Sequence, residues 1–238
     1  MLREMFKTDK NIDSRASVAL YVYFISHICY LFFYRVYEDM DIAFIFKPII
    51  VPSIAFAYFF ITKSLKIYLN LSLFLVIFFA DNLILLEVQE LKVFSTYLYL
   101  IAIGILFNYA VTDSQLFRKN QFLKNNFKYF IISYLVLVIL YKIVSMAFYF
   151  EFKELFVVIG YIVMFLMVLI LSVYNAIRFK SIASRFLLLT ILCLFFSDIF
   201  IVLNKYYFKS DIFIYISCII EIPVYYFLLE YLLYREKY

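Results

Sequence analysis

Long apolar segments are the feature that most constrains this chain. A helix needs about 20 mostly apolar residues to cross the hydrocarbon core of a bilayer. Eight segments reach that length, at residues 17–36, 43–62, 66–87, 92–111, 127–149, 153–176, 182–203 and 211–233. We therefore predict an all-α polytopic membrane protein, a bundle of eight transmembrane helices that forms one domain over residues 1–238.

The composition agrees with this interpretation. Hydrophobic residues make up 67% of the 238 residues, whereas soluble domains contain about 45–50%. A membrane β-barrel would alternate apolar and polar residues over units of about 10 residues, but these segments are apolar on all sides. The chain has only two glycines, which excludes a glycine-rich phosphate loop.

We expect no nucleic-acid partner, and the oligomeric state stays open.

Lys and Arg residues predict the orientation. They gather before the first segment, in the second, fourth and sixth connections, and after the last segment. Cytoplasmic loops carry an excess of these residues. We therefore expect an inner cell membrane protein with both termini in the cytoplasm.

Four ionisable residues lie well inside the apolar segments: Lys47, Asp81, Asp198 and Glu221. Each costs about 2.5–3.5 kcal/mol at the centre of a bilayer, so such residues usually pair or line a cavity. Counted from the nearest segment ends, all four lie in the outer half of the membrane. We expect them to meet in one polar pocket.

Structural roles are equally open at this point. Lys47 with Asp81, or Asp198 with Lys205, are suited to ion pairs between helices. Both lysines lie near enough to a membrane surface for their amines to reach it. Glu221 is also suited to stay protonated and hydrogen-bonded to its own helix.

Excluding the other common catalytic groups leaves chemistry carried out by carboxyl groups. One histidine and three cysteines cannot form a three-histidine or cysteine-rich zinc site, and we interpret His27 as a hydrogen-bonded core residue. No serine lies in a G-x-S-x-G motif. Two neighbouring carboxyl groups can hold different protonation states, so that one donates a proton and the other accepts one. This suits reactions through an oxocarbenium ion. We expect no metal and no cofactor.

Four motifs then resemble a known family. They are "FKPIIVPSIAF" in the second segment, "FFADNLILLE" in the third, "RFLLLTILCLFFSDIFIVLNKYYF" in the seventh and "EIPVYYFLLEYLL" in the eighth. Together they resemble the YhhN-type lysoplasmalogenase family of membrane proteins. The most specific part is Ser197-Asp198 followed by Asn204-Lys205. The chain departs from the family pattern in having Ala80 before Asp81 and no histidine in the fourth segment.

The resemblance implies a hydrolase that cleaves the vinyl ether bond of lysoplasmalogens. The products would be a fatty aldehyde and a glycerophospho-alcohol. Asp81 and Asp198 would share the acid and base roles. Substrate and water would be held by a second set of residues: Lys47, Asn82, Ser197, Lys205, Glu221 and Tyr226. The partners would be the lysophospholipid substrate and the surrounding membrane lipids.

Two other functions fit the same residues. Carboxylates and lysines inside a membrane also form the pathway of ion- or proton-coupled transporters. A transporter of small molecules or lipids is disfavoured because the charges gather in one half of the membrane and no internal repeat is evident. A non-catalytic lipid-binding membrane protein is the remaining alternative.

Overall fold

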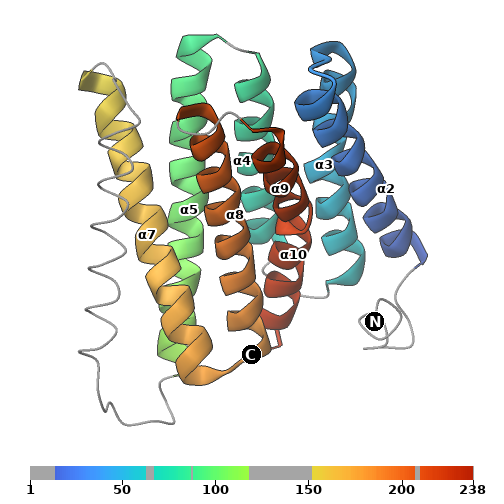
Figure 1. The fold of residues 1–238 in the computed structure, drawn as a ribbon. Coiled ribbons are helices and arrows are strands. Elements are labelled where there is room, and N and C mark those ends of the chain that lie inside the picture. The colour runs from blue at the N-terminus through green and yellow to red at the C-terminus, as the bar shows by residue number, and fades with distance from the viewer. Residues whose placement is uncertain (1–13, 63–66, 87, 118–151, 207–209, 238) are drawn as a thin grey trace.

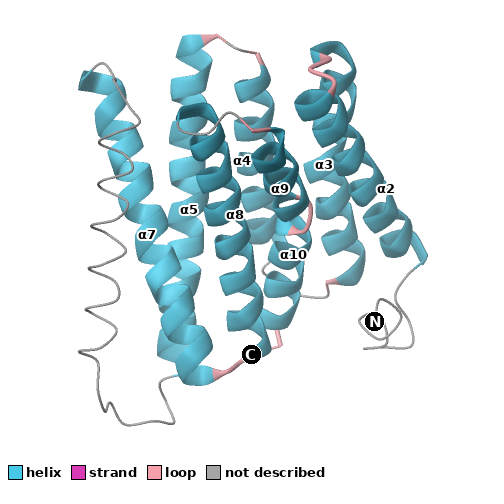
Figure 2. Cartoon of the chain, viewed as in Figure 1, coloured by secondary structure: helices cyan, strands magenta, loops and turns pink. Residues whose placement is uncertain are grey.

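The computed structural model describes residues 14–62, 67–86, 88–117, 152–206 and 210–237. These residues form helices joined by short turns, and no strand occurs among them (Figures 1 and 2). The helices in chain order are α2 (Ser14–Leu31), the π-helix η1 (Phe32–Val36), α3 (Met40–Ile61), α4 (Ile67–Leu85), α5 (Gln89–Phe117), α7 (Phe152–Phe179), α8 (Ile182–Tyr206), α9 (Asp211–Glu221) and α10 (Val224–Arg235).

Seven helical segments in the described part of the chain are long and apolar enough to cross a membrane. α2 with η1 forms the first, and α9 with α10 forms the last. Their positions confirm seven of the predicted segments to within a few residues, apart from α5, which continues further toward its C-terminal end. The predicted segment 127–149 lies outside the described residues, so a bundle of eight helices stays a prediction.

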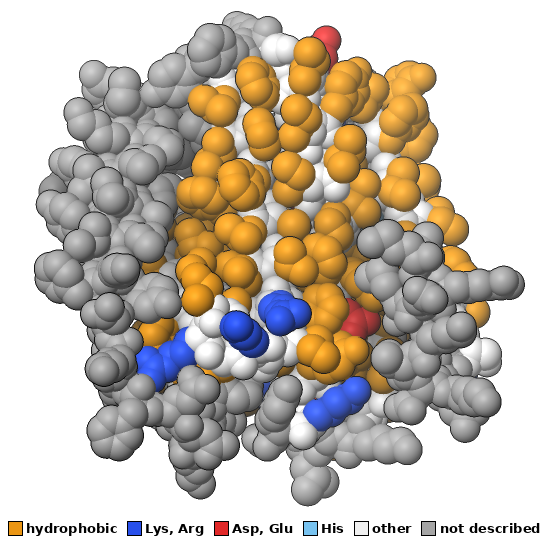
Figure 3. Space-filling view, turned by 60° about the horizontal axis from the view of Figure 1, so that its bottom comes forward, with side chains coloured by type: hydrophobic (Ala, Val, Ile, Leu, Met, Phe, Trp, Pro, Cys, Tyr) orange, Lys and Arg blue, Asp and Glu red, His pale blue; other side chains and the backbone are white. Residues whose placement is uncertain are grey.

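The long helices stand side by side (Figure 1). Each packs against the next described one along the chain from α2 to α8, and α9 packs against α8. α10 packs against both α8 and α3, which places the last segment beside the second. On the face shown in Figure 3, a broad band of hydrophobic side chains lies above Lys and Arg side chains gathered at one end. We call that end the lower end, because it is the bottom of Figure 1.

Side-chain caps fix the turns at both ends of the bundle. At the upper end, the Asp39 carboxylate accepts a hydrogen bond from the backbone N–H of Ile42 at 3.1 Å, which caps α3. At the lower end, the Ser181 hydroxyl accepts the N–H of Ser184 at 3.1 Å at the start of α8. These caps bind amide groups that a helix start leaves without a partner. Both turns therefore join adjacent helices with few residues.

The first and last segments depart from regular α-helix, and the second contains two prolines. α2 continues into the π-helix η1, α3 contains Pro48 and Pro52, and the last segment is interrupted at residues 222–223. Proline lacks an N–H and so frees a backbone carbonyl. The Tyr23 hydroxyl of α2 donates a hydrogen bond to the carbonyl of Ile222 at the interruption. This hydrogen bond joins the interruption of the last membrane segment to the first membrane segment.

A buried carboxylate holds α5 to α10 at the lower end. The Asp113 oxygens accept hydrogen bonds from the Tyr231 hydroxyl at 2.7 Å and from Arg235 Nε at 2.8 Å. The Arg235 guanidinium also lies over the Tyr109 ring, 4.1 Å from its centroid. Asp113 is a buried charge that the sequence analysis missed, because the predicted segment ended at residue 111 whereas α5 continues to Phe117.

A second group of bonds continues this network to α3 and α4. Asn70 donates to the Tyr58 hydroxyl at 2.6 Å and accepts from the Tyr109 hydroxyl at 2.7 Å. The Tyr58 and Thr62 hydroxyls both donate to the carboxylate of Glu236. Four helices and the residue after α10 are therefore linked at one level, which we call the lower network.

Removing the Asp113 carboxylate should destabilise the protein. Asp113→Ala leaves the half-buried Arg235 without its carboxylate partner, so the cost should lie near the lower end of the about 3–5 kcal/mol for breaking a buried pair. The free energy of unfolding in detergent measures the effect. The matched control is Asp211→Asn, an exposed carboxylate in the first turn of α9, which should cost at most about 1 kcal/mol. Equal losses for the two variants would contradict a clamping role for Asp113.

Candidate functional site

A buried ion pair between α3 and α4 lies at the centre of the upper half. Lys47 Nζ is 3.3 Å from Asp81 Oδ2, with the two side chains 9% and 3% exposed. Asp81 also accepts hydrogen bonds from the Tyr225 hydroxyl at 2.6 Å and from the Tyr99 hydroxyl. The Lys47 amine lies 4.4 Å from the centroid of the Tyr30 ring. Five helical elements therefore contribute to one charged centre, and both Asp81 oxygens are occupied by donors.

The packing of α3 explains this convergence. α3 lies against α2, α4 and α10, and Lys47 is located about two turns from its start at Met40. Asp81 lies about one turn before the end of the antiparallel α4. Tyr225 lies in the first turn of α10, just beyond the interruption of the last segment. Residues from opposite ends of the sequence thus reach the same depth.

Glu221, the last residue of α9, lies near nitrogen atoms of His27 and Arg35, at distances longer than a direct hydrogen bond. His27 Nε2 lies 4.0 Å from one carboxylate oxygen and Arg35 Nη2 lies 4.0 Å from the other. A hydrogen bond between such atoms would measure about 2.7–3.2 Å. Among the described residues, His27 Nε2 and Arg35 Nε are buried nitrogens that have no hydrogen-bond partner. The Glu221 carboxylate therefore lies beside two buried nitrogen atoms that have no hydrogen-bond partner of their own in the described part of the chain.

Each irregular helical stretch of the upper half adjoins one of these charges. Arg35 belongs to the π-helix η1, Lys47 directly precedes Pro48, and Glu221 ends α9 immediately before the interruption. Single π-turns within α-helices occur frequently at functional sites. A π-helix, a proline and a helix interruption therefore each lie next to a charged residue of the cluster.

Asp198 approaches this cluster from α8. It lies within electrostatic range of Glu221 and Arg35, and its residue is exposed. No hydrogen bond or ion pair joins Asp198 to Asp81, although both residues are described. Lys47 interacts electrostatically with Glu221 as well. The two predicted catalytic carboxylates therefore belong to one cluster through Glu221 and do not form a contacting pair.

The other predicted binding residues are engaged locally. The Asn82 amide donates to the carbonyl of Phe78 in its own helix at 2.7 Å. The Ser197 hydroxyl donates to the carbonyl of Ser217 at 3.4 Å, which joins α8 to α9. Tyr226 is buried, with its ring centroid 5.8 Å from that of Phe24. Lys205 lies in the last turn of α8, and its side chain is outside the described part of the structure. Their substrate-binding roles stay predictions.

Sequence reasoning missed three members of the site. Arg35 lies at the very end of the predicted segment 17–36 and was not among the candidate residues, because no sequence pattern predicts a π-turn. Tyr99 is one of 24 tyrosines, and nothing in the sequence distinguishes it from those that pack against lipid. His27 was interpreted as a hydrogen-bonded core residue. Its Nδ1 does lie 3.3 Å from the Tyr23 hydroxyl oxygen, but its other nitrogen faces Glu221.

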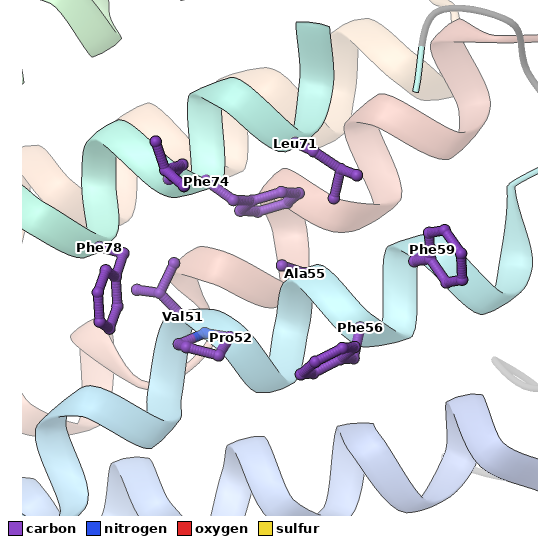
Figure 4. Close-up of a pocket in the computed structure, with 9 residues that line it drawn as sticks. Val51, Pro52, Ala55, Phe56, Phe59, Leu71, Phe74 and Phe78 are labelled. Carbon is purple, nitrogen blue, oxygen red and sulfur yellow. The ribbon is translucent and has the colours of Figure 1, made fainter. Parts of the chain in front are cut away.

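An apolar groove between α3 and α4 begins one turn from the Lys47–Asp81 pair. Its volume is about 400 Å³, and it is lined by Val51, Pro52, Ala55, Phe56, Phe59, Leu71, Phe74, Leu75 and Phe78. Figure 4 shows Val51, Phe74 and Phe78 in the space between the two helices. Val51 follows Lys47 by four residues and Phe78 precedes Asp81 by three, so these residues are neighbours on the same helix faces. The groove leads from the charged centre toward the lower end.

Within the described residues, no group of three or more His, Cys, Asp or Glu side chains is arranged to hold a metal ion. No family model matches the chain, and neither a curated protein nor a solved structure matches it. The resemblance to lysoplasmalogenases therefore stays a prediction.

The Lys47–Asp81 pair should show strong energetic coupling. Lys47→Met and Asp81→Asn each leave one buried charge unpaired, and each should cost about 3–5 kcal/mol of unfolding free energy. The double variant should be less destabilised than the sum of the two, by about 0.5–3 kcal/mol, because residues in contact are coupled. The free energy of unfolding in detergent is measured for the native protein, the two single variants and the double variant. Lys92→Met, which alters an exposed lysine on α5, is the control. Additive costs in the cycle would contradict the pairing.

Proposed function

We propose that the chain is a membrane-embedded hydrolase that cleaves the vinyl ether bond of a lysophospholipid. The supporting observation is a cluster of three carboxyl groups and two permanent cations at one depth, adjoining an apolar groove of about 400 Å³. A single-chain lipid has the matching chemistry, since it joins a charged head to one hydrocarbon chain through the bond to be cleaved.

The reaction needs an acid and a water molecule. Protonation of the alkene carbon of the vinyl ether gives an oxocarbenium ion, and water then adds to the adjacent carbon. The resulting hemiacetal releases the glycerol oxygen and becomes an aldehyde. We assign proton donation to Asp198, because it is exposed and therefore accessible to an entering lipid. An ionised carboxylate nearby stabilises the cation, and Asp81 suits this role because its partners hold it in place.

The head and the chain of the substrate would occupy different parts of the site. Lys47 acts as a point charge for the phosphate or glycerol oxygens, and Arg35 offers a guanidinium at the same level. The hydrocarbon chain lies in the groove between α3 and α4, which begins one turn away. The vinyl ether bond joins head and chain, so it lies next to the carboxylates.

The lower end of the bundle would face the cytoplasm. Five basic residues lie near the lower ends of α7, α8 and α10, namely Arg178, Lys180, Arg185, Arg235 and Lys237. The cytoplasmic ends of membrane proteins carry an excess of Lys and Arg. The charged cluster then lies in the half of the membrane away from the cytoplasm. The lipid would enter sideways from that leaflet.

Aldehyde release from a defined lipid tests the proposal. Purified protein in lipid nanodiscs is expected to release a fatty aldehyde from a lysoplasmalogen and to leave the saturated alkyl-ether analogue intact, because that analogue has no alkene to protonate. Hydrolysis of both lipids would contradict the oxocarbenium route. Uptake or binding of the vinyl ether lipid without aldehyde release would instead support the transporter or the lipid-binding alternative.

Loss of either aspartate should abolish turnover. Asp198→Asn removes the proton donor and Asp81→Asn removes the stabilising carboxylate, so each should lower the rate of aldehyde release on the order of 10²–10⁴-fold. Unfolding in detergent has to be measured in parallel, because Asp81→Asn also breaks an ion pair. Near-native turnover by folded Asp198→Asn protein would rule out its role as the acid.

Filling the groove should change chain-length preference. Ala55→Phe adds bulk where the chain of the substrate would lie, so turnover should shift toward lipids with shorter chains. Competition between two lysoplasmalogens that differ only in chain length measures this shift. The control is Ile25→Phe on the exposed face of α2, which should keep the original preference. An unchanged preference in Ala55→Phe would exclude the groove as the chain site.

A further inference from the structure

His27 has a position that the proposed function does not yet use. It is the one histidine of the chain, and it is completely buried. Its Nδ1 lies 3.3 Å from the Tyr23 hydroxyl oxygen. Its Nε2 lies 4.0 Å from a carboxylate oxygen of Glu221 and has no hydrogen-bond partner among the described residues. A buried imidazole nitrogen thus faces a carboxylate across a short distance.

The surrounding bonds determine which nitrogen of His27 carries the hydrogen. The Tyr23 hydroxyl donates to the carbonyl of Ile222. A carbonyl oxygen can only accept, so the single hydrogen of the hydroxyl is used there. The Tyr23 oxygen can then only accept from His27, which requires a hydrogen on Nδ1. A neutral imidazole has one ring N–H, so Nε2 presents a lone pair to Glu221.

Two hydrogen-bond acceptors therefore face each other. The Nε2 lone pair and the carboxylate oxygen repel each other at short distance. A molecule that donates one hydrogen bond to each of these two atoms would bridge them. Water has two hydrogens, and hydrogen bonds of about 2.8 Å to each acceptor are compatible with the 4.0 Å separation. Arg35 lies 4.0 Å from the second Glu221 oxygen, where its charge favours the ionised carboxylate.

We propose that His27 and Glu221 hold the water that attacks the substrate, each accepting one of its hydrogens. This assignment rests on the proposed function. A water held by both hydrogens keeps its oxygen lone pairs free to form the new bond to carbon. As the C–O bond forms, an O–H bond breaks and its proton passes to His27 or Glu221. That proton then moves to the glycerol oxygen as its bond to carbon breaks, and the hemiacetal hydroxyl proton returns to Asp198.

The tautomer of His27 tests the arrangement without any turnover. Because the chain has one histidine, labelling with ¹⁵N-histidine gives the ring-nitrogen resonances of His27 alone. In lipid nanodiscs at neutral pH we expect a protonated Nδ1 and an unprotonated, hydrogen-bonded Nε2. The opposite neutral tautomer would overturn the proposal. A doubly protonated ring would also overturn it, since Nε2 could no longer accept a hydrogen from water.

Two amide variants separate a catalytic role from a structural one. Asn places its amide near the position of Nδ1, whereas Gln reaches the position of Nε2. His27→Asn keeps a partner for Tyr23 but loses the water, and should lower aldehyde release on the order of 10²–10⁴-fold. His27→Gln retains an acceptor for the water and should be the faster of the two. A role limited to the bond with Tyr23 predicts the reverse order.

Glu221→Gln should lose activity like His27→Asn, and the double variant should be no slower than the slower single variant, because the two groups act as a unit. Glu90→Gln, an exposed change in the first turn of α5, should keep the native rate. If the native protein releases no aldehyde, the proposed function fails and the tautomer alone decides for the His27–Glu221 pair. An active native protein with equally active folded His27→Asn would overturn the inference itself.

Discussion

The energy of a charge in an apolar medium organises this structure. An unpaired ion in the bundle would cost several kcal/mol, and two carboxylates avoid that cost in the same way. Asp81 is bound by Lys47 and by tyrosine hydroxyls in the upper half, and Asp113 is bound by Arg235 and Tyr231 in the lower half. The tyrosines supply donors that are themselves largely apolar, which suits a bundle in lipid. The high tyrosine content thereby acquires a structural role beyond contact with the bilayer surface.

Glu221 differs from both of these carboxylates. The nearest nitrogens of His27 and Arg35 lie 4.0 Å from its oxygens, although the same bundle brings Nε of Arg235 to 2.8 Å from Asp113. A structure selected only for stability would close such a gap, because an unpaired polar nitrogen that is buried costs about 1–3 kcal/mol. The nitrogens of His27 and Arg35 beside Glu221, which have no hydrogen-bond partner among the described residues, are therefore the part of the upper cluster best suited to bind something else.

Hydropathy predicted the positions of the seven described membrane segments, because spanning a bilayer requires long apolar segments that are visible in sequence. The shared depth of Lys47 and Asp81 was also predictable from the sequence, since it depends only on the number of residues from the helix ends. Burial of Asp113 was not predicted, because the fourth predicted segment ended at residue 111 whereas α5 continues to Phe117. The three members of the site that were missed depend on packing between helices distant in sequence, as in the contact of His27 with Glu221.

The distribution of polar groups along α3 and α4 bears on whether the bundle conducts ions. The Lys47–Asp81 pair and the Tyr58–Asn70 bond are separated by eleven residues on each helix, or about 16 Å at 1.5 Å per residue. The buried side chains of α4 between these levels are all apolar, namely Leu73, Phe74, Ile77 and Ala80. On α3 the one buried polar residue between them, Ser53, bonds to its own helix at Ile49. In this part of the bundle a proton moving between the two levels would meet an apolar layer, whereas a lipid entering from the side meets the charges directly. This arrangement favours chemistry at one depth over transport across the membrane.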